Sequence, residues 1–447
     1  MPFNDVTSRA KTRICFIYGL EPRITNLFPG QRIGQVYDFG RLARHVQSGR
    51  DLLPRVIMQE QLVEGGLELP RLGNIYPLPA MDVLSVSVTV TPRGDPVLVI
   101  DGEIKESIGS GEIAELLAAT CFERSEMRLA GVLLTEWLLA RLTQAGAQLD
   151  SLDFGSDVHQ CVFPEASLQE RLHGRQDSGE VNRIASQILY RGTVPVDSGL
   201  DPGIYAPPGL NHHGSTFAAH GRGVSLFTGW TIHLEHAFML TAISTVSALG
   251  AVRLARHEAF DAMALTQDAT QEPVGSGRSL VAQLSDRLNE MQLDLSFGVE
   301  AHIDSALIPE MVVESFQRSL GEAVGIRESL DNTSRMLQRV GTVISVRLSK
   351  LEAADRDRIE RRDRLVAVLV AVASLLALPP ALLLAFFGIN ARQVDPAHSI
   401  FDLHAYWGAY CLAWLPFIML VSVGSVLYSR IRGRGGWPGA APRARGK

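Results

Sequence analysis

Cysteine is scarce in this chain, with 4 residues among 447. Cys15, Cys121, Cys161 and Cys411 are widely separated, which argues against a disulfide framework and against the paired spacing of a zinc site. No glycine-rich loop ends in Gly-Lys-Ser/Thr, and no nucleophile elbow is present. The sequence therefore carries no enzyme signature, and we expect neither an enzyme nor a bound cofactor.

An apolar stretch is missing from the N-terminus, "MPFNDVTSRAKTR", so we expect no cleaved signal peptide. A basic excess is missing as well. The formal net charge is -6, which gives no reason to expect a nucleic-acid partner.

Charged residues are absent from two long stretches near the C-terminus. Residues 365–389 carry none and correspond to about 37 Å of helix, which is enough to cross a bilayer. Residues 405–429 are likewise uncharged, and a short polar loop separates the two stretches. The pattern predicts two transmembrane helices in contact with a lipid bilayer.

Basic residues are distributed unequally around these stretches. Arginines crowd residues 356–364, and residues 430–447 are basic without any acidic residue, whereas the loop 390–404 holds a single arginine, Arg392. By the positive-inside rule, both termini face the cytoplasm and the loop faces outward. We therefore expect a multi-pass protein of the cell (inner or plasma) membrane.

The rest of the chain predicts a soluble part of more than one unit. The expected order is a cytoplasmic α/β domain over 1–232, a cytoplasmic helical segment over 233–308, a long stalk helix over 309–364, transmembrane helix 1 over 365–389, an outward-facing loop over 390–404, transmembrane helix 2 over 405–429 and a basic cytoplasmic tail over 430–447.

Strand patterns dominate the start of the soluble part. "KTRICFIYGL" reads as a strand. Residues 83–91 alternate, Pro92-Arg93-Gly94-Asp95 is typical of a turn, and residues 97–100 return as the second strand of a hairpin. A helix is expected from a cap at Ser110. Residues 170–222 are rich in Gly, Pro, His and Asp and are expected to form a loop.

A third uncharged stretch, "HAFMLTAISTVSALGAV", also has the length of a membrane span. Its Ser, Thr and Gly content and its close flanking by Glu235 and Arg253 favour a buried helix of the soluble part. His233 and His236 share a face of this helix. Nothing in the sequence fixes the third ligand that a zinc site needs, so solvated or core histidines are favoured.

The approach to the membrane has the strongest periodicity. No proline occurs between Pro309 and Pro379. Every seventh position of a stripe is apolar, namely Leu330, Leu337, Ile344 and Leu351. This predicts one unbroken helix over 309–388, and it favours association between copies over packing on the chain's own domain.

Asn390 stands where the first apolar stretch ends. Two membrane helices enclose no polar path, so conduction would require several copies around an axis. Asn390 and the last backbone carbonyls would then form a ring of neutral oxygen ligands, which suits a hydrated divalent cation such as Mg²⁺. Alternatively, Asn390 simply ends the helix as a cap.

The long helix that enters the first of two C-terminal spans, the short outer loop and the basic C-terminus together resemble the CorA family of divalent-cation transporters. The family ends its first span in Gly-Met-Asn, usually after an aromatic residue, and Phe387-Gly388-Ile389-Asn390 stands in that place. Pro379 matches a proline position of the family. The second span opens with Trp407-Gly408 and is followed by an arginine-rich segment with Trp437. The likeness covers roughly residues 310–437.

The resemblance implies a CorA-like funnel: an α/β cytoplasmic domain, a long stalk helix and two C-terminal transmembrane helices, assembled as a homopentamer. The first span would line a pore, and Gly388, Ile389 and Asn390 would form the selectivity filter, with Asn390 holding the metal ion. The transported ion would be Mg²⁺, with Co²⁺, Ni²⁺ or Zn²⁺ as alternatives. Further pore-lining positions would be Ala381, Leu378, Ser374 and Val370.

Several residues depart from the family pattern. Ile389 replaces the usual methionine, and Ala381 stands where members often have threonine. Pro379-Pro380 leaves two helix carbonyls without donors, and these either face the pore or mark a kink.

In the outer loop, Arg392 would add positive charge near the mouth, which Asp395 and Asp402 would offset. These departures keep a second hypothesis open, a non-conducting CorA-like homologue that acts as a membrane-anchored sensor or scaffold.

Overall fold

The computed structural model describes residues 9–24, 30–47, 53–61, 67–69, 78–173, 178–192, 204–211, 214–268, 274–304, 306–389, 399, 402–411, 414–415, 417–419 and 421–422. The chain divides into two compact units, Met1–Arg347 and Leu348–Lys447.

A mixed sheet of eight strands forms the centre of the first unit, in the order β10-β11-β9-β1-β6-β5-β3-β2. Its strands are β1 (Arg13–Glu21), β2 (Gln31–Arg32), β3 (Arg55–Glu60), β5 (Met81–Val90), β6 (Pro96–Ile104), β9 (Asp153–Phe163), β10 (Phe217–His220) and β11 (Val224–Thr228). Neighbours are antiparallel except β9 and β11, which run parallel. The predicted first strand and the predicted hairpin are β1 and the pair β5–β6. A small second sheet pairs β4 (Leu67–Glu68), β7 (Arg128–Leu129) and β8 (Val132–Leu133).

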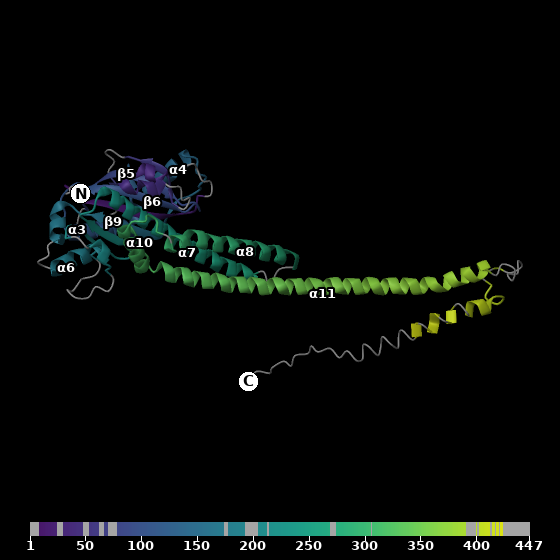
Figure 1. The fold of residues 1–447 in the computed structure, drawn as a ribbon. Helices are drawn as coiled ribbons and strands as arrows, with labels where there is room; N and C mark the ends of the chain where they lie inside the picture. The colour runs from purple at the N-terminus through teal and green to yellow at the C-terminus, as the bar shows by residue number, and fades with distance from the viewer. Residues whose placement is uncertain are drawn as a thin grey trace, which may run out of the picture. The chain divides into compact units, whose positions relative to one another are not determined.

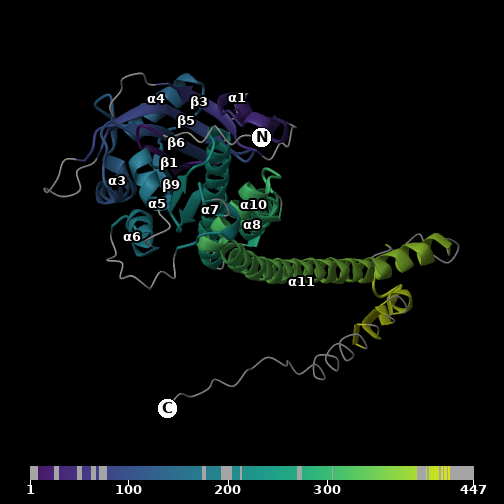
Figure 2. The same ribbon diagram turned by 60° about the vertical axis from the view of Figure 1, so that its left-hand side comes forward.

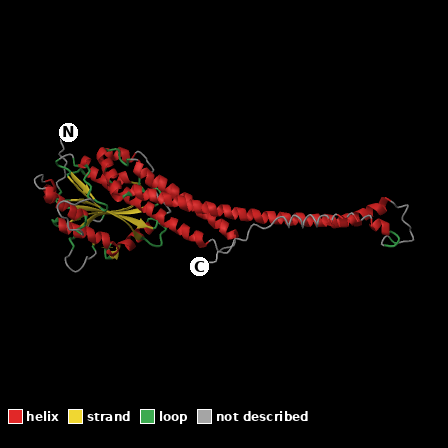
Figure 3. Ribbon diagram, turned by 90° about the horizontal axis from the view of Figure 1, so that it is seen from below, coloured by secondary structure: helices red, strands yellow, loops and turns green. Residues whose placement is uncertain are grey.

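Helices cover both faces of the large sheet (Figure 3). The helices of the described residues are α1 (Ile33–Val36), α2 (Ala43–Gln47), α3 (Ser110–Phe122), α4 (Leu134–Gln144), α5 (Ala166–His173), α6 (Ser178–Leu189), α7 (Ile232–Asp268), α8 (Val274–Asp294), α9 (Ala301–Asp304), α10 (Met311–Val324) and α11 (Ile326–Ile389). Short helical turns are η1 (Gly40–Leu42), η2 (Arg124–Glu126), η3 (Pro208–Leu210) and the π-helical η4 (Leu295–Glu300).

Alternation along β1 explains the two faces. Phe16 and Tyr18 point to a core shared with α3, α5 and α6, while Cys15 and Ile17 point to a second core shared with α7 and α10. Figure 2 shows these two groups of helices on opposite sides of the strands. The first unit is therefore an α/β structure. Within the predicted helical segment 233–308, α7 packs on the sheet and α8 packs on α7, and both belong to this unit.

Two expectations differ from the structure in this unit. The expected loop 170–222 contains α6 and β10, because apolar residues such as Ile184 and Ile188 meet the core despite flanking Gly- and Pro-rich sequence. The N-cap of α3 is Gly109 and not Ser110, and the Gly109 amide donates to Glu112 Oε2 over 2.8 Å.

The expected unbroken helix over 309–388 is divided in two. Gly325 lies between α10 and α11 in the left-handed conformation, with φ of 67°, and its amide bonds back to the last turn of α10. Glycine ends helices in this way because it lacks a Cβ. The second piece, α11, is still 64 residues long and runs through the predicted first span (Figure 1).

The start of the heptad stripe is covered by the chain itself. Leu330, Leu337 and Ile344 are buried. α11 lies against α7 and α8 here, since Arg256 of α7 donates to Thr333 Oγ1 over 3.2 Å and a Cβ on Gly341 would meet a methyl of Leu288. These positions therefore pack within one copy, which is the alternative that the sequence disfavoured, and association between copies stays a prediction for the rest of the stripe.

Replacing Gly325 tests the helix break. The change Gly325→Ala should lower the free energy of unfolding by about 1 kcal/mol, because an L-residue strains at positive φ. Among the described residues no atom lies within 4 Å of the added Cβ, so the effect is one of the backbone alone. In contrast, Gly321→Ala inside α10 should raise stability by up to about 1 kcal/mol. Thermal unfolding that ranks the two variants in the opposite order would contradict this account.

Buried histidines should make the unit sensitive to acid. Burial lowers the pKa of His159 to about 3 and the pKa of His220 to about 4. As pH falls below about 6.5, the unfolded chain takes up protons that the folded chain excludes, so stability falls by up to about 1.4 kcal/mol per pH unit for each histidine. Unfolding measured between pH 6.5 and 5 should show this slope. In the His220→Gln variant, the free energy of unfolding should depend less steeply on pH. An unchanged dependence would show that His220 does not cause the acid sensitivity.

Candidate membrane-spanning helix

Two helices in the described part of the chain are long and apolar enough to cross a membrane, namely the stretches Ile232–Ala264 and Ile326–Leu383. The most apolar window of the first has mean hydropathy 1.6 and is 72% buried, whereas that of the second has mean hydropathy 2.5 and is only 6% buried. The first stretch already has its apolar surface covered, because α7 fills the second core. Of these two stretches, the one in α11 leaves its apolar surface uncovered, and the burial of the other agrees with the prediction that residues 236–252 form a buried helix.

Exposed apolar side chains surround this part of α11. Leu365, Val366, Val368, Leu369 and Val370 are consecutive or nearly so and are all more than half exposed. Consecutive helix positions turn by about 100°, so these residues project to every side. A helix that is apolar all round is buried, either by lipid or by other protein.

The predicted pore-lining residues share one face of α11. At about 100° per residue, Val370, Ser374, Ala381 and Gly388 project within about 40° of one another, and Leu378 lies about 40° further round. Ala377 and Ala385 fall on the same face, although the sequence reading did not single them out. A helical projection of the small residues would have found them. We call the set Ser374, Ala377, Ala381, Ala385 and Gly388 the small-residue face.

The opposite side of α11 carries large residues, including Leu365, Leu369, Val372 and Leu383. Pro379 projects to this side, about 160° from Ala381, and is buried. The carbonyl of Leu375, which lacks its donor because of Pro379, therefore lies away from the small-residue face. This placement favours the kink over the pore as the reason for the double proline.

The filter residues are placed only in part. Gly388 and Ile389 are the last residues of α11, and Gly388 is exposed. Asn390, Arg392 and Asp395 lie outside the described residues. Asp402 accepts the His404 amide over 3.1 Å, and its carbonyl accepts from Tyr406 over 3.1 Å, so it caps the turn that precedes the second span.

The predicted second span, 405–429, is described in part. Its described residues between Trp407 and Ser422 are helical, and Ser422 donates to the Ile418 carbonyl one turn earlier over 2.7 Å. Trp407, Leu415, Ile418 and Met419 are each at least 60% exposed. This segment thus has the same uncovered apolar surface as the span in α11.

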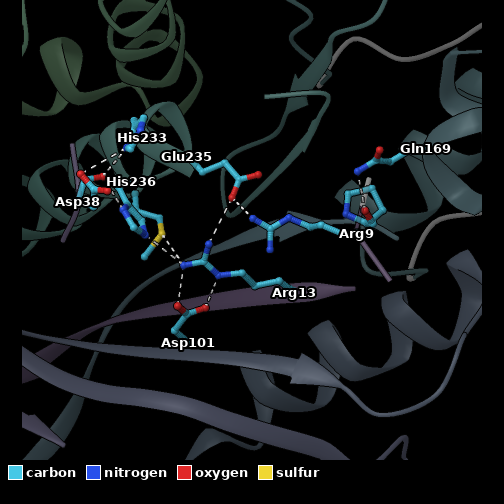
Figure 4. A network of polar contacts seen from close by, with 10 residues as sticks. Arg9, Arg13, Asp38, Asp101, Gln169, His233, Glu235 and His236 are labelled. Carbon is cyan, nitrogen blue, oxygen red and sulfur yellow. Dashed lines mark hydrogen bonds and ion pairs between the residues drawn. The ribbon is translucent and has the colours of Figure 1, made fainter. Parts of the chain in front are cut away.

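The first unit holds a buried charged cluster between α7 and the sheet (Figure 4). Arg13 of β1 donates twice to Asp101 of β6, over 2.7 and 2.6 Å, and once to Glu235 of α7 over 3.2 Å. Arg9 donates to the same Glu235 oxygen. Burial raises the pKa of Glu235, while Arg9 and Arg13 act against that rise. We call Arg9, Arg13, Asp101 and Glu235 the buried ion cluster.

Histidine extends the cluster towards the surface. His236 Nδ1 lies 2.8 Å from the Asp38 carbonyl, and its Nε2 lies 3.5 Å from Arg13 Nη2. Since Arg13 can only donate, Nε2 accepts and Nδ1 carries the proton. His233 lies 3.4 Å from the Asp38 carboxylate. His236 is thus held by hydrogen bonds to Arg13 and to the Asp38 carbonyl.

No group of three or more His, Cys, Asp or Glu side chains among the described residues is arranged to hold a metal ion. Each charged group of the buried ion cluster is paired with another, so the cluster links α7 to the sheet. Sequence reading missed it because Arg13 is separated from Asp101 by 88 positions and from Glu235 by 222.

No known protein family, curated protein or solved structure matches this chain. The likeness to the CorA family therefore rests on the residues quoted above and on the order of the segments.

Proposed function

We propose that this chain is a membrane transporter or channel for divalent metal cations, with Mg²⁺ as the first candidate and Co²⁺, Ni²⁺ or Zn²⁺ as alternatives. The observation that carries the proposal is the uncovered apolar part of α11, which ends with Gly388 and Ile389, directly before Asn390 in the sequence. Such a surface calls for lipid and for further protein around it. The proposed location is the cell (inner or plasma) membrane, with both termini in the cytoplasm.

Several copies are needed to enclose a path, and the proposed assembly is a homopentamer. The small-residue face supports it, since small side chains let helices approach closely and leave room along an axis. Val370 and Leu378 would form apolar rings able to gate by losing water. Ser374 would supply a hydroxyl within the path, or would bond to its own helix.

At the outer end, the carbonyls of the last turn and the Asn390 amide would form the filter. Neutral oxygens suit a hard cation that keeps part of its hydration shell, as Mg²⁺ does. Gly388 has no side chain that would narrow the path along the axis of the proposed pentamer. The Ile389 side chains would pack around the filter. Arg392 works against cation entry, and Asp395 and Asp402 of the same loop would offset it.

The competing proposal is a non-conducting homologue that anchors a cytoplasmic sensor or scaffold to the membrane. Ala381 in place of a hydroxyl, the double proline and Arg392 favour it. Purified full-length protein in proteoliposomes that contain a Mg²⁺ indicator separates the two. The transport proposal expects entry above that of protein-free vesicles, with Co²⁺, Ni²⁺ and Zn²⁺ ranked in the same assay. If none of these ions enters the vesicles although the protein is a folded oligomer, transport is contradicted and the proposal of a membrane-anchored sensor or scaffold is supported.

A further inference from the structure

Three arginines lie on one face of α11, directly before its apolar part. At about 100° per residue, Arg358, Arg361 and Arg362 project within a sector of about 100°. At about 1.5 Å per residue, they precede Leu365 by about 10, 6 and 5 Å along the helix axis. All three side chains are exposed. We call these three residues the arginine face.

The charge of the arginine face is not neutralised by the acidic residues nearby. Glu360 and Asp363 project about 150° away from its centre, and Glu360 is paired with Arg364 over 3.3 Å. Asp355 and Asp357 stand at the borders of the face, further from the apolar part of α11 than any of its arginines. The three guanidinium groups make no hydrogen bond or ion pair with any residue that the structure describes. They are therefore open to an anion from outside the chain.

The arginine face continues the side of α11 that carries large residues. Leu365 and Leu369 project within about 40° of its centre, whereas the small-residue face is centred about 150° away. In the proposed assembly the small-residue face lines the path, so the arginine face points outwards to the lipid. The headgroup region of one leaflet is about 5–8 Å thick. Arg361 and Arg362 therefore lie at the depth of the lipid phosphates, and the long Arg358 side chain extends into the same layer.

We propose that the arginine face binds the phosphate groups of anionic phospholipids in the cytoplasmic leaflet. A guanidinium group donates two parallel hydrogen bonds to a phosphate, and basic residues beside a membrane span attract anionic lipids. A zwitterionic headgroup fits less well, because its own cation competes for the phosphate. The bound lipids hold the start of the span at a fixed depth in the leaflet. The inference rests on the proposed membrane insertion of α11, but it does not require conduction.

Lipid binding to the full-length protein in detergent micelles tests this inference. The probe is phosphatidylglycerol with a fluorophore on one acyl chain, and its fluorescence anisotropy rises when it binds to the protein. Phosphatidylcholine with the same fluorophore measures binding without a net charge on the lipid. The wild type should bind the phosphatidylglycerol probe at least about tenfold more tightly. Salt at about 0.5 M should remove most of this difference.

Substitutions on two sides of α11 show which arginines bind the lipid. The triple variant Arg358→Gln, Arg361→Gln and Arg362→Gln should bind the phosphatidylglycerol probe at least about fivefold more weakly, and Arg358→Gln alone about twofold to threefold. Arg356→Gln is the matched control, because it removes the same charge at nearly the same height but projects about 160° from Arg358. It should bind both probes as the wild type does. The basic tail over 430–447 is the same in all variants, so their differences report on the arginine face.

Gel filtration shows whether each variant keeps the oligomeric state of the wild type, and the single variants carry the test if the triple variant does not. Equal affinity of the wild type for the two probes would overturn the inference. Undiminished binding of phosphatidylglycerol to the arginine-face variants would overturn it too, as would an equal loss in Arg356→Gln and Arg358→Gln. Displacement of the lipid probe by inorganic phosphate at the same concentration would overturn it in favour of a free phosphate ion.

Flotation of the same samples with phosphatidylcholine vesicles separates this inference from the proposed function. Protein that floats with the vesicles but shows no lipid preference would contradict the arginine face alone. Protein that does not float with them would contradict the membrane span and this inference together. A lipid preference that depends on the arginine face would support the inference even if no ion crosses the membrane.

Discussion

Ala381→Trp should reduce Mg²⁺ flux at least about 100-fold, because five indole rings on the small-residue face would fill the path that the proposed pore needs. Ala381 projects within about 20° of Val370 and Gly388 on α11. The substitution keeps the helix apolar, so insertion into the membrane should be unaffected.

Leu383→Trp is the matched control for this substitution. Leu383 lies two positions further along α11 and projects about 160° away, on the side with the large residues. It should leave flux within about twofold of the wild type, since a large apolar residue there replaces another. Equal loss in both variants, with the oligomer intact, would mean that the small-residue face does not line the path.

Glu235→Ala should lower the free energy of unfolding of the first unit by about 3–5 kcal/mol, since it leaves Arg9 and Arg13 buried with one carboxylate between them. Few single changes elsewhere in this unit should cost as much. Chemical denaturation, followed by circular dichroism on the full-length protein, measures the loss. At a temperature where the first unit of this variant stays folded, we expect its Mg²⁺ flux to equal that of the wild type.

Asp82→Ala serves as the control for that loss. Asp82 pairs with Lys105 over 2.9 Å, but both side chains are about half exposed. Removal of this pair should cost no more than about 1 kcal/mol. A loss of that small size for Glu235→Ala as well would show that the buried ion cluster does not hold α7 to the sheet.

Local sequence patterns predicted the elements whose cause is local. β1 follows from its apolar run, and the β5–β6 hairpin follows from the alternation over 83–91 and from the turn at Gly94, which has φ of 90°. The burial of α7 followed from its polar content and close charges. The apolar part of α11 was predicted from the absence of charged residues over 365–389, and its length could be predicted without any tertiary information.

Features set by tertiary contacts were not predictable in the same way. α6 is followed by a stretch rich in glycine and proline, and Ile184 and Ile188 anchor it in the core. The left-handed conformation of Gly325 could not be predicted, because a single glycine inside a helical pattern is also tolerated within a continuous helix. The heptad stripe looks the same whether α7 and α8 or another copy covers it, and the structure shows that the chain covers its first part.

The most direct measurement compares Mg²⁺ entry into proteoliposomes for the wild type and for Asn390→Ala, with oligomeric state checked for both. The proposed filter at Gly388, Ile389 and Asn390 requires that entry be lost in the variant while the assembly persists, because the amide oxygens that hold the hydrated ion are gone. Wild-type entry that persists unchanged in Asn390→Ala would contradict the filter. No entry through the wild type would contradict transport itself.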